Sequence, residues 1–263
     1  MSYALITGAS SGIGRNYASE LARRGYDIIA VSNQPEALAK SVQELKAEFG
    51  VDARYLCVDL AKASSAHDIF LWCEEQNLEV EVLVCNAGML LFGTLMQTDP
   101  ERLRTIVDLH CTTTTLLVRY FGKKMKERRR GHILIMSSST AWLPYPTISH
   151  YSATKAYLKN FASAMWYELH RYGVSVTALF PGAVDTPLYK LSDKLRRRFV
   201  ALGVMMRPEV VARRGVRAMM RGRRRLTPGL FTKLVVVVCA LLPARLFDLL
   251  LRLKPIRELL ERV

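Results

Sequence analysis

One short stretch near the start of the chain constrains the fold more than any other. Residues 3–7 (YALIT) form an apolar, β-branched run, and Gly8, Gly12 and Gly14 follow it directly, ahead of a helical pattern that ends at Gly25. Glycine lets a backbone turn tightly and approach a phosphate, and the first turn of a helix offers free N–H groups to that phosphate. The stretch therefore predicts a strand, a phosphate-binding loop and a helix, in that order.

Similar apolar runs recur along the chain and alternate with segments of helical length and period. They span residues 3–7, 27–32, 53–58, 81–86, 132–137 and 175–180. Alternating strands and helices predict an α/β fold, with one doubly wound parallel sheet covered by helices on both faces. A chain of 263 residues, half of them hydrophobic, fits one such domain. We expect the domain over residues 1–228 and an apolar and basic helical extension over residues 229–263.

Six short motifs then follow one another in a familiar order. They are TGASSGIG (7–14), VDL (58–60), CNAG (85–88), SSS (137–139), YSATK (151–155) and PGAVDT (181–186). In these motifs the chain resembles the short-chain dehydrogenase/reductase family, and the resemblance covers residues 1–190. It implies a Rossmann-type fold and an oxidoreductase that moves a hydride between a nicotinamide cofactor and a carbonyl or alcohol.

The resemblance also assigns residues to the cofactor. They are Gly8, Ser10, Ser11, Gly12, Ile13, Gly14, Arg15, Asn33, Asp59, Leu60, Asn86, Ala87, Gly88, Tyr151, Lys155, Pro181, Gly182, Val184 and Thr186. A carboxylate at the end of the second strand would bind the ribose 2′-hydroxyl of NAD, whereas a basic group would accommodate the 2′-phosphate of NADP. Ser32, Asn33 and Gln34 are neither, and Arg15 is expected near the ribose, so the sequence favours NADP(H) over NAD(H). Asp59 is expected beside the adenine or, alternatively, as the cap of the next helix.

Tyr151 and Lys155 are the expected catalytic pair. A phenol with a pKa of about 10 is a poor acid–base catalyst near neutral pH unless a positive charge stabilises its anion, and Lys155 lies one helical turn further on. Tyr151 would then protonate a carbonyl oxygen, or remove a hydroxyl proton in the reverse reaction. Ser138 ends a strand and by resemblance binds the substrate oxygen. A second pair, Tyr120 and Lys124, has no such serine and leads into a basic run, so we interpret it as a solvated helix end.

His110 is a departure from the family pattern. In the stretch IVDLHCTT it occupies the register of an asparagine that, by resemblance, holds a water in a proton relay to the lysine. An imidazole can also bind water and carry protons, so His110 is a candidate relay member. The alternative is a buried histidine bonded to a carbonyl. Asn86 to Gly88 are expected to support the sheet and the cofactor floor, and Cys85 and Cys111 are expected to pack in the core.

The expected substrate follows from two apolar segments. The loop over about residues 187–207 and the segment 142–145 across the cleft are rich in large apolar side chains. We expect an apolar substrate with one carbonyl or secondary alcohol, such as a lipid, acyl chain or steroid; alternatively, these side chains only pack the loop. Two other functions stay open. One is reduction of 3-oxoacyl groups on an acidic carrier protein, and the other is a non-catalytic dinucleotide sensor that docks to a membrane or partner.

Net charge is +15, and almost all of the excess lies in the last quarter of the chain. Residues 190–263 contain 19 Lys and Arg against 5 Asp and Glu. The apolar run 234–242 is far shorter than the roughly 20 residues that cross a bilayer. Apolar helices beside arginine clusters suit an anionic membrane surface, so we expect peripheral membrane contact through residues 230–263; a dimer contact or a flap over the substrate are the alternatives. No nucleic-acid partner is expected, because no aromatic stacking platform accompanies the arginines.

The start of the chain and its cysteines indicate a compartment. Met1 leads directly into an apolar strand without a basic region or cleavage site, and the five cysteines are scattered, with no disulfide or zinc spacing. We therefore expect reduced thiols, no metal and a cytoplasmic protein, at the inner face of a membrane if the tail binds lipid. The family resemblance adds a homo-oligomer, a dimer or a tetramer.

Overall fold

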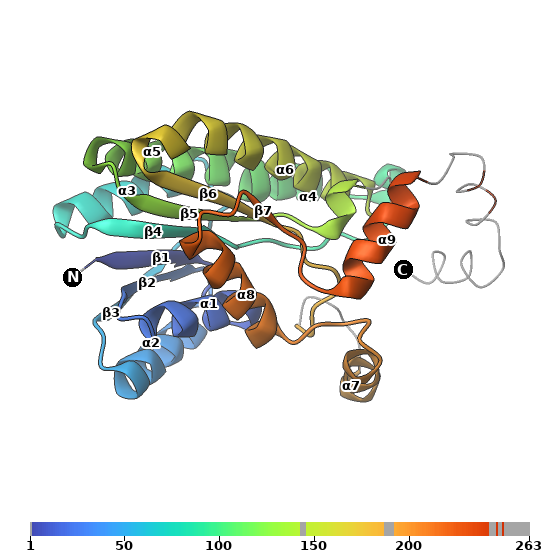
Figure 1. Ribbon diagram of the computed structural model, residues 1–263, viewed down its shortest axis with the longest axis horizontal. Coiled ribbons are helices and arrows are strands. Elements are labelled where there is room, and N and C mark those ends of the chain that lie inside the picture. The colour runs from blue at the N-terminus through green and yellow to red at the C-terminus, as the bar shows by residue number, and fades with distance from the viewer. Residues whose placement is uncertain (1, 143–145, 187–191, 242–245, 247–248, 250–263) are drawn as a thin grey trace.

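Seven parallel strands form one sheet in the computed structural model, which describes residues 2–142, 146–186, 192–241, 246 and 249 (Figure 1). Their order across the sheet is β3-β2-β1-β4-β5-β6-β7. The strands are β1 (Tyr3–Thr7), β2 (Asp27–Ser32), β3 (Ala53–Cys57), β4 (Val80–Cys85), β5 (Gly131–Met136), β6 (Val174–Leu179) and β7 (Arg225–Leu226). The first six coincide with the predicted runs to within one residue at each end, and the predicted Rossmann-type α/β fold is confirmed.

Helices cover both faces of the sheet, as predicted (Figure 1). On one face lie α1 (Gly12–Ala22), α2 (Pro35–Phe49) and α8 (Pro208–Met220); on the other lie α3 (Ser65–Glu75), α4 (Pro100–Val107), α5 (Thr113–Arg128) and α6 (Ser149–Leu169). A π-helical turn, Asp108–Thr112, joins α4 to α5, and a 3₁₀ turn, Ser139–Trp142, follows β5. Two further helices, α7 (Asp193–Ala201) and α9 (Leu230–Leu241), stand at the end of the molecule where the strands finish.

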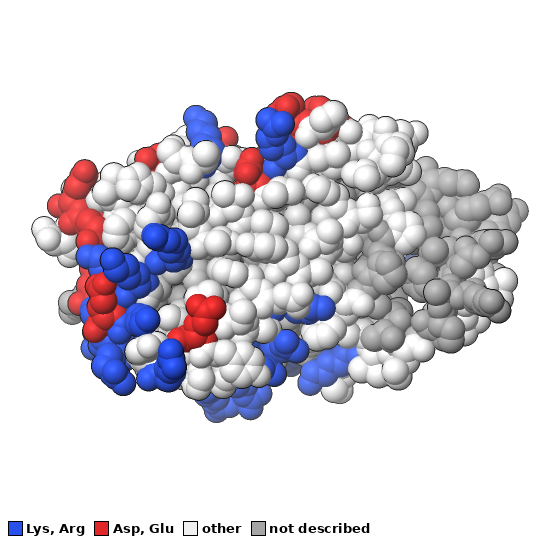
Figure 2. Space-filling model, turned by 90° about the horizontal axis from the view of Figure 1, so that it is seen from above, with Lys and Arg blue, Asp and Glu red and all other residues white. Residues whose placement is uncertain are grey.

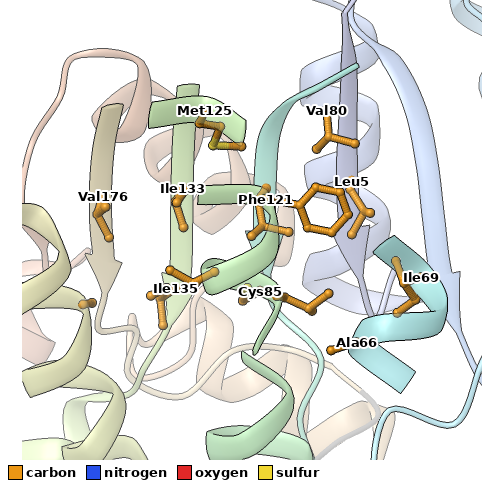
Figure 3. Close-up of a cluster of buried hydrophobic side chains, with 14 of the residues drawn as sticks. Leu5, Ala66, Ile69, Val80, Cys85, Phe121, Met125, Ile133, Ile135 and Val176 are labelled. Atoms are coloured by element: carbon orange, nitrogen blue, oxygen red, sulfur yellow. The ribbon is translucent and has the colours of Figure 1, made fainter. Parts of the chain in front are cut away.

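The core consists of two apolar clusters, one on each face of the sheet. Because helices bury both faces, the strands are continuous apolar runs without the alternation of a half-exposed sheet. In one cluster Phe121 and Met125 of α5 and Ile69 of α3 pack over Leu5 of β1 and Ile133 of β5 (Figure 3). Burial of each such side chain contributes about 1.5–3 kcal/mol to the free energy of folding. The packed sheet is therefore a rigid support for the loops at the ends of its strands.

The strand order creates the place for a ligand. From β1 the chain adds β2 and then β3 on one side, and it then crosses back to add β4, β5, β6 and β7 on the other side of β1. The direction in which strands are added therefore reverses between β1 and β4. In open parallel sheets the loops diverge at such a reversal and leave a crevice outside the carboxyl ends of the strands. All seven strands are parallel, so their carboxyl ends meet at this one edge.

The side of the molecule covered by α5 and α6 is poor in charge over its middle. Lys and Arg gather instead towards the end where the strands begin and along one long edge (Figure 2). A surface of this kind can be covered by another copy of the chain without burial of unpaired charge. The homo-oligomer expected from the sequence remains a prediction, and this surface is compatible with it.

Candidate active site

The glycine loop adopts backbone conformations that favour glycine. Gly8 and Gly12 have φ angles of +69° and +54°, in the left-handed region. A Cβ on Gly14 would lie closer than 3.0 Å to both the carbonyl oxygen and the carbonyl carbon of Gly8, so no side chain fits there. Because α1 begins at Gly12, its unpaired first N–H groups border the loop. The loop thus has the shape and the donors that a pyrophosphate requires.

Asn86 ties the end of β4 to the end of β1. Its amide nitrogen donates to the Thr7 carbonyl at 3.0 Å, and the backbone N–H groups of Asn86 and Ala87 both donate to the Thr7 hydroxyl oxygen at 3.0 Å. These bonds join the two strands at the reversal of strand order. They agree with the supporting role that the sequence suggested for this segment.

A cavity of about 500 Å³ lies at the carboxyl ends of β1 to β4. Its walls include the predicted residues Gly8, Ser10 to Gly14, Asn33, Asp59, Leu60, Asn86 to Gly88 and Thr186. The volume is in the range of cofactor sites, and the wall offers hydroxyls, amides and backbone N–H groups rather than carboxylates, Asp59 excepted. These features fit a dinucleotide, with its pyrophosphate at the glycine loop.

Arg15 is paired with a neighbouring helix in this structure. Its guanidinium pairs with the Glu44 carboxylate of α2 at 3.1 Å and also bonds the Ser19 hydroxyl, and Arg15 does not line the cavity. Its expected place at the ribose end therefore stays a prediction. That end carries Ser32, whose hydroxyl oxygen is 3.0 Å from that of Ser10, beside exposed Asn33. The prediction of NADP(H) rests mainly on residues 32–34 at the end of β2, which include no carboxylate.

Asp59 lies where a ligand would meet it. It lines the large cavity, and its carboxylate accepts the N–H of Ala61 at 3.0 Å. This bond closes a turn two residues long, whereas α3 begins only at Ser65. Asp59 is thus not the cap of that helix, and its place in the wall agrees with the expected position beside the cofactor.

A smaller cavity of about 90 Å³ brings the four candidate catalytic residues together. Ser138 comes from the end of β5, Tyr151 and Lys155 from the first turns of α6, and His110 from the π-helical turn. The predicted cofactor residues Pro181, Gly182, Val184 and Thr186 complete its wall. It shares Ile13, Asn86, Gly88, Met89 and Thr186 with the large cavity, so the two are adjoining parts of one site.

Lys155 is buried and held by the end of β5. Its ammonium donates to the Met136 carbonyl at 3.1 Å, and its own backbone carbonyl accepts the Ser137 hydroxyl at 2.7 Å. Burial lowers the pKa of Lys155 from 10.5 to about 8, with a smaller opposing effect of Cys111. The ammonium lies 5.5 Å from the centre of the Tyr151 ring. A positive charge thus lies beneath the phenol near neutral pH.

Ser138 is buried in the same cavity, and its hydroxyl oxygen accepts the N–H of Thr140 at 3.2 Å. That bond uses an acceptor site and leaves the hydroxyl proton able to donate to an oxygen in the cavity. Ser138 and Tyr151 therefore place two hydroxyl groups of donor character beside the predicted nicotinamide end of the site.

The family is decided by sequence comparison. The sequence model of the family described as short chain dehydrogenase matches residues 2–196. The chain belongs to the short-chain dehydrogenase/reductase family. Its fold agrees with this oxidoreductase family.

Named relatives and a solved structure resemble this family member over most of its length. The 17-beta-hydroxysteroid dehydrogenase type 3 of Rattus norvegicus is 34% identical over 74% of the chain, and the very-long-chain 3-oxoacyl-CoA reductase of Ajellomyces capsulatus is 33% identical over 72%. The matches cover only 63% and 57% of those two proteins. A short-chain dehydrogenase of Sphingobium yanoikuyae, solved with NADPH, superposes with a TM-score of 0.79 at 26% identity, covering 90% of this chain and 92% of that one.

His110 is buried, as the second sequence-based interpretation expected, but its ring bonds an N–H and a hydroxyl instead of a carbonyl, and its part in a proton relay stays a prediction. The ring Nε2 accepts the backbone N–H of Met89 at 3.1 Å, so that nitrogen carries no proton. The proton of the neutral ring then sits on Nδ1, which lies 2.8 Å from the Thr154 hydroxyl oxygen; that hydroxyl donates to the Tyr151 carbonyl at 2.7 Å. Burial, with the nearby charges of Lys155 and His150, lowers the pKa of His110 well below its usual value. Both ring nitrogens are thus engaged by the protein, neither with a carbonyl.

This arrangement links three elements through a neutral imidazole. The π-helical turn that carries His110 is bonded to the loop after β4 through Met89 and to α6 through Thr154. Sequence analysis missed both partners. Thr154 could have been suspected, because it lies inside the YSATK motif, directly before Lys155. Met89 could not, because it contributes only its backbone N–H, which every residue except proline has.

The second tyrosine and lysine pair lies elsewhere, as the sequence suggested. Lys124 pairs with Glu74 of α3, and the Tyr120 ring stacks on Phe70 with 5.2 Å between ring centres. Neither residue lines the two cavities. The pair contributes to the contact between α3 and α5.

The two cysteines near the site have the properties of packing residues. Burial raises the pKa of Cys85 to about 12 and raises that of Cys111 above its usual value, so neither thiol is activated. Trp142 packs on Phe180, with ring centres 5.6 Å apart. Of the other predicted substrate residues, 143–145 and 187–191 lie outside the described residues. Residues 192–207 are described: they include α7, where Arg196 pairs with Asp185 at 3.4 Å, and none of them lines the catalytic cavity.

Stability should depend on pH through Lys155. Its pKa is lower in the folded chain (about 8) than the usual 10.5, so between these values the unfolded chain binds more protons and stability rises with pH. The full rise is about 3 kcal/mol. Lys155→Met removes the buried charge, so the variant should be the more stable form near neutral pH and should lack the rise.

The measurement is urea unfolding of the wild type and of Lys155→Met across this pH range. The difference between the two proteins is the quantity to use, because the thiols of Cys73 and Cys85, whose pKa values burial raises to about 12, act in the opposite sense in both. A difference that stays constant with pH would contradict a buried, titrating Lys155.

Proposed function

We propose that the protein is an NAD(P)-dependent carbonyl reductase or alcohol dehydrogenase with Tyr151 as its general acid and base. The observation that carries this proposal is the meeting of Ser138, Tyr151 and Lys155 in one small cavity that adjoins the large one. Ser138 follows β5, whereas Tyr151 and Lys155 lie in α6. A local sequence pattern alone would not bring all three beside a cavity large enough for a dinucleotide.

A nicotinamide dinucleotide bound in the larger cavity supplies or accepts the hydride. The chain's own residues handle the oxygen and its proton. Ser138 donates a hydrogen bond to the substrate oxygen and holds it beside Tyr151, and Tyr151 transfers its phenolic proton to that oxygen as a carbonyl becomes an alcohol. The Lys155 ammonium stabilises the negative charge that the departing proton leaves on the phenol. In the oxidation of an alcohol the proton moves back to Tyr151.

We propose an apolar substrate with one carbonyl or secondary alcohol, of lipid, acyl or steroid type. Met89, Met136 and Val184 give the catalytic cavity an apolar wall around its polar centre. Two named relatives, a hydroxysteroid dehydrogenase and a very-long-chain 3-oxoacyl-CoA reductase, bear names of this substrate class. The test is consumption of NADPH and NADH by the purified protein with steroid ketones, long-chain 3-oxoacyl thioesters and sphingoid ketones.

The same panel separates the other functions. Turnover of a carrier-bound 3-oxoacyl substrate well above that of its free thioester would favour a carrier-linked reductase. Tight NADPH binding with no turnover of any ketone would favour the non-catalytic sensor and would remove the enzyme from consideration.

Cofactor choice gives a separate prediction at Asn33. Asn33 is exposed at the end of β2, in the wall of the large cavity, where a carboxylate would bind a ribose 2′-hydroxyl and repel a 2′-phosphate. Asn33→Asp should shift the ratio of kcat/KM for NADPH over NADH about 10- to 100-fold towards NADH, the scale of one charged contact. Asn33→Ser is the neutral control. An unchanged ratio in Asn33→Asp would place the ribose elsewhere.

A further inference from the structure

A basic groove of about 410 Å³ lies between α8, β7 and the start of α9, outside the site described above. Its cationic wall consists of Arg214, Arg217, Arg221, Arg223 and Lys233. Among the residues that the structure describes, no carboxylate lies within ion-pair distance of any of these five side chains. Their charge is therefore available to an anion from outside the chain.

Beside the groove, α9 turns its apolar side outward. Leu230, Leu234, Val237 and Leu241 follow one another at helical spacing along one face, with Phe231 and Val238 next to them, and the exposed fractions of all six are 48–85%. Among the residues of α9 whose burial the structure describes, 230–238 and 241, the buried one is the polar Thr232, which contacts the backbone at Gly182. This is the reverse of an ordinary surface helix, which buries its apolar stripe.

The groove and the exposed stripe are one surface. Leu230 belongs to the stripe and also lines the groove, and Lys233 of α9 supplies one of the five cations. We call these residues together the α9 surface. It combines clustered positive charge with a contiguous apolar face, and a water-facing surface rarely carries both without a ligand.

We propose that the α9 surface binds the face of an anionic phospholipid bilayer. Lipid phosphates suit the unpaired arginines, and the acyl region just beneath them suits the apolar stripe. A soluble acidic protein would meet the charge but would offer no apolar layer along the whole stripe. None of the helices in the described part of the chain is long and apolar enough to cross a bilayer. The exposed apolar stripe runs along the length of α9, so we place this helix parallel to the bilayer surface.

This location has a consequence for catalysis. The inner side of α9 contacts Gly182, which lines the catalytic cavity, and it also packs against the 3₁₀ turn Ser139–Trp142 that follows Ser138. A bilayer at the α9 surface would thus lie next to the cavity, and an apolar substrate could pass from lipid to Tyr151 without crossing water. Membrane binding goes beyond the proposed function and is measured without turnover, so either can fail alone.

The experiment is flotation of the full-length protein with vesicles of phosphatidylcholine alone and of phosphatidylcholine with phosphatidylglycerol in equal parts. Wild type should float with the anionic vesicles, and less so at high salt. Arg217→Glu with Arg221→Glu should lower the partition coefficient by about 30-fold or more, since each cation near the headgroups contributes about 1 kcal/mol. Leu234→Ser with Val238→Ser should also lower it, without a change in thermal unfolding, because both side chains are exposed.

The matched control is Lys40→Glu with Lys123→Glu, which makes the same change in net charge at exposed lysines of α2 and α5. It should bind vesicles as the wild type does. Equal loss in this control and in the groove variant would overturn the proposal, because it would reduce the effect to net charge. A second result would also overturn the proposal. In it, the wild type does not float with vesicles but is retained on an immobilised acidic carrier protein, and the groove variant is not retained. The α9 surface would then bind a protein.

Discussion

Tyr151→Phe should lower turnover strongly while the protein stays folded and keeps its cofactor affinity. The substitution removes one oxygen, the proton donor to the substrate, and keeps the ring that meets His110 edge to face with 5.8 Å between ring centres. A positioned acid or base contributes about 10²- to 10⁴-fold, so kcat should fall by that factor. The measurements are steady-state kinetics on the best substrate of the panel and NADPH titration of both proteins.

Tyr120→Phe is the matched control for this prediction. Tyr120 also precedes a lysine by four residues, but it packs on Phe70 away from both cavities. Its variant should keep wild-type kcat. If Tyr151→Phe kept it as well, another group would have to supply the proton, and the proposed mechanism would be wrong.

Gly14→Ala should cost both stability and cofactor binding. The added Cβ meets the Gly8 carbonyl and the Asn86 amide, each closer than 3.0 Å, and the Gly8 group is backbone, so the loop has to move. Overpacking of this kind costs about 1–3 kcal/mol of the free energy of unfolding. The displacement also changes the shape of the proposed pyrophosphate site, so the affinity for NADPH should fall as well. Urea unfolding and NADPH titration measure the two effects.

Gly122→Ala separates this effect from a general intolerance of alanine. Gly122 lies in the interior of α5, and a Cβ there would meet its nearest atoms at 3.7 Å, an ordinary contact distance. Alanine favours a helix over glycine by up to about 1 kcal/mol, so this variant should be as stable as the wild type or more stable. Wild-type NADPH affinity in Gly14→Ala would mean that the pyrophosphate does not lie on the glycine loop.

The strands and the glycine loop could be predicted because their signals are local. Burial on both faces makes a parallel strand a continuous apolar run, and six such runs are visible in the sequence. The spacing of Tyr151 and Lys155 is also local, since residues four apart share a helix face. These predictions agree with the structure because one short segment contains all the information that they need.

The partners of single side chains could not be predicted in this way. Arg15 of α1 pairs with Glu44 of α2, 29 positions further along the chain, whereas the sequence suggested a place near the ribose. His110 was expected to hold a water or a carbonyl, and it bonds an N–H and a hydroxyl on two other elements. Which donor meets which acceptor depends on how helices pack on the sheet, and sequence spacing does not contain that geometry.

The sequence by itself determined the fold class and the family, since periodicity and motif order specify strands, helices and the residues that end them, and it also named the residues that we propose as catalytic. Only the tertiary structure decided that Ser138, Tyr151, Lys155 and His110 share one cavity and that α9 exposes its apolar side next to a groove lined by arginines. The physical reason is that burial is a property of the packed chain. An apolar stripe in a sequence predicts a helix face, but only the neighbours of that face decide whether it lies in the core or meets the surroundings.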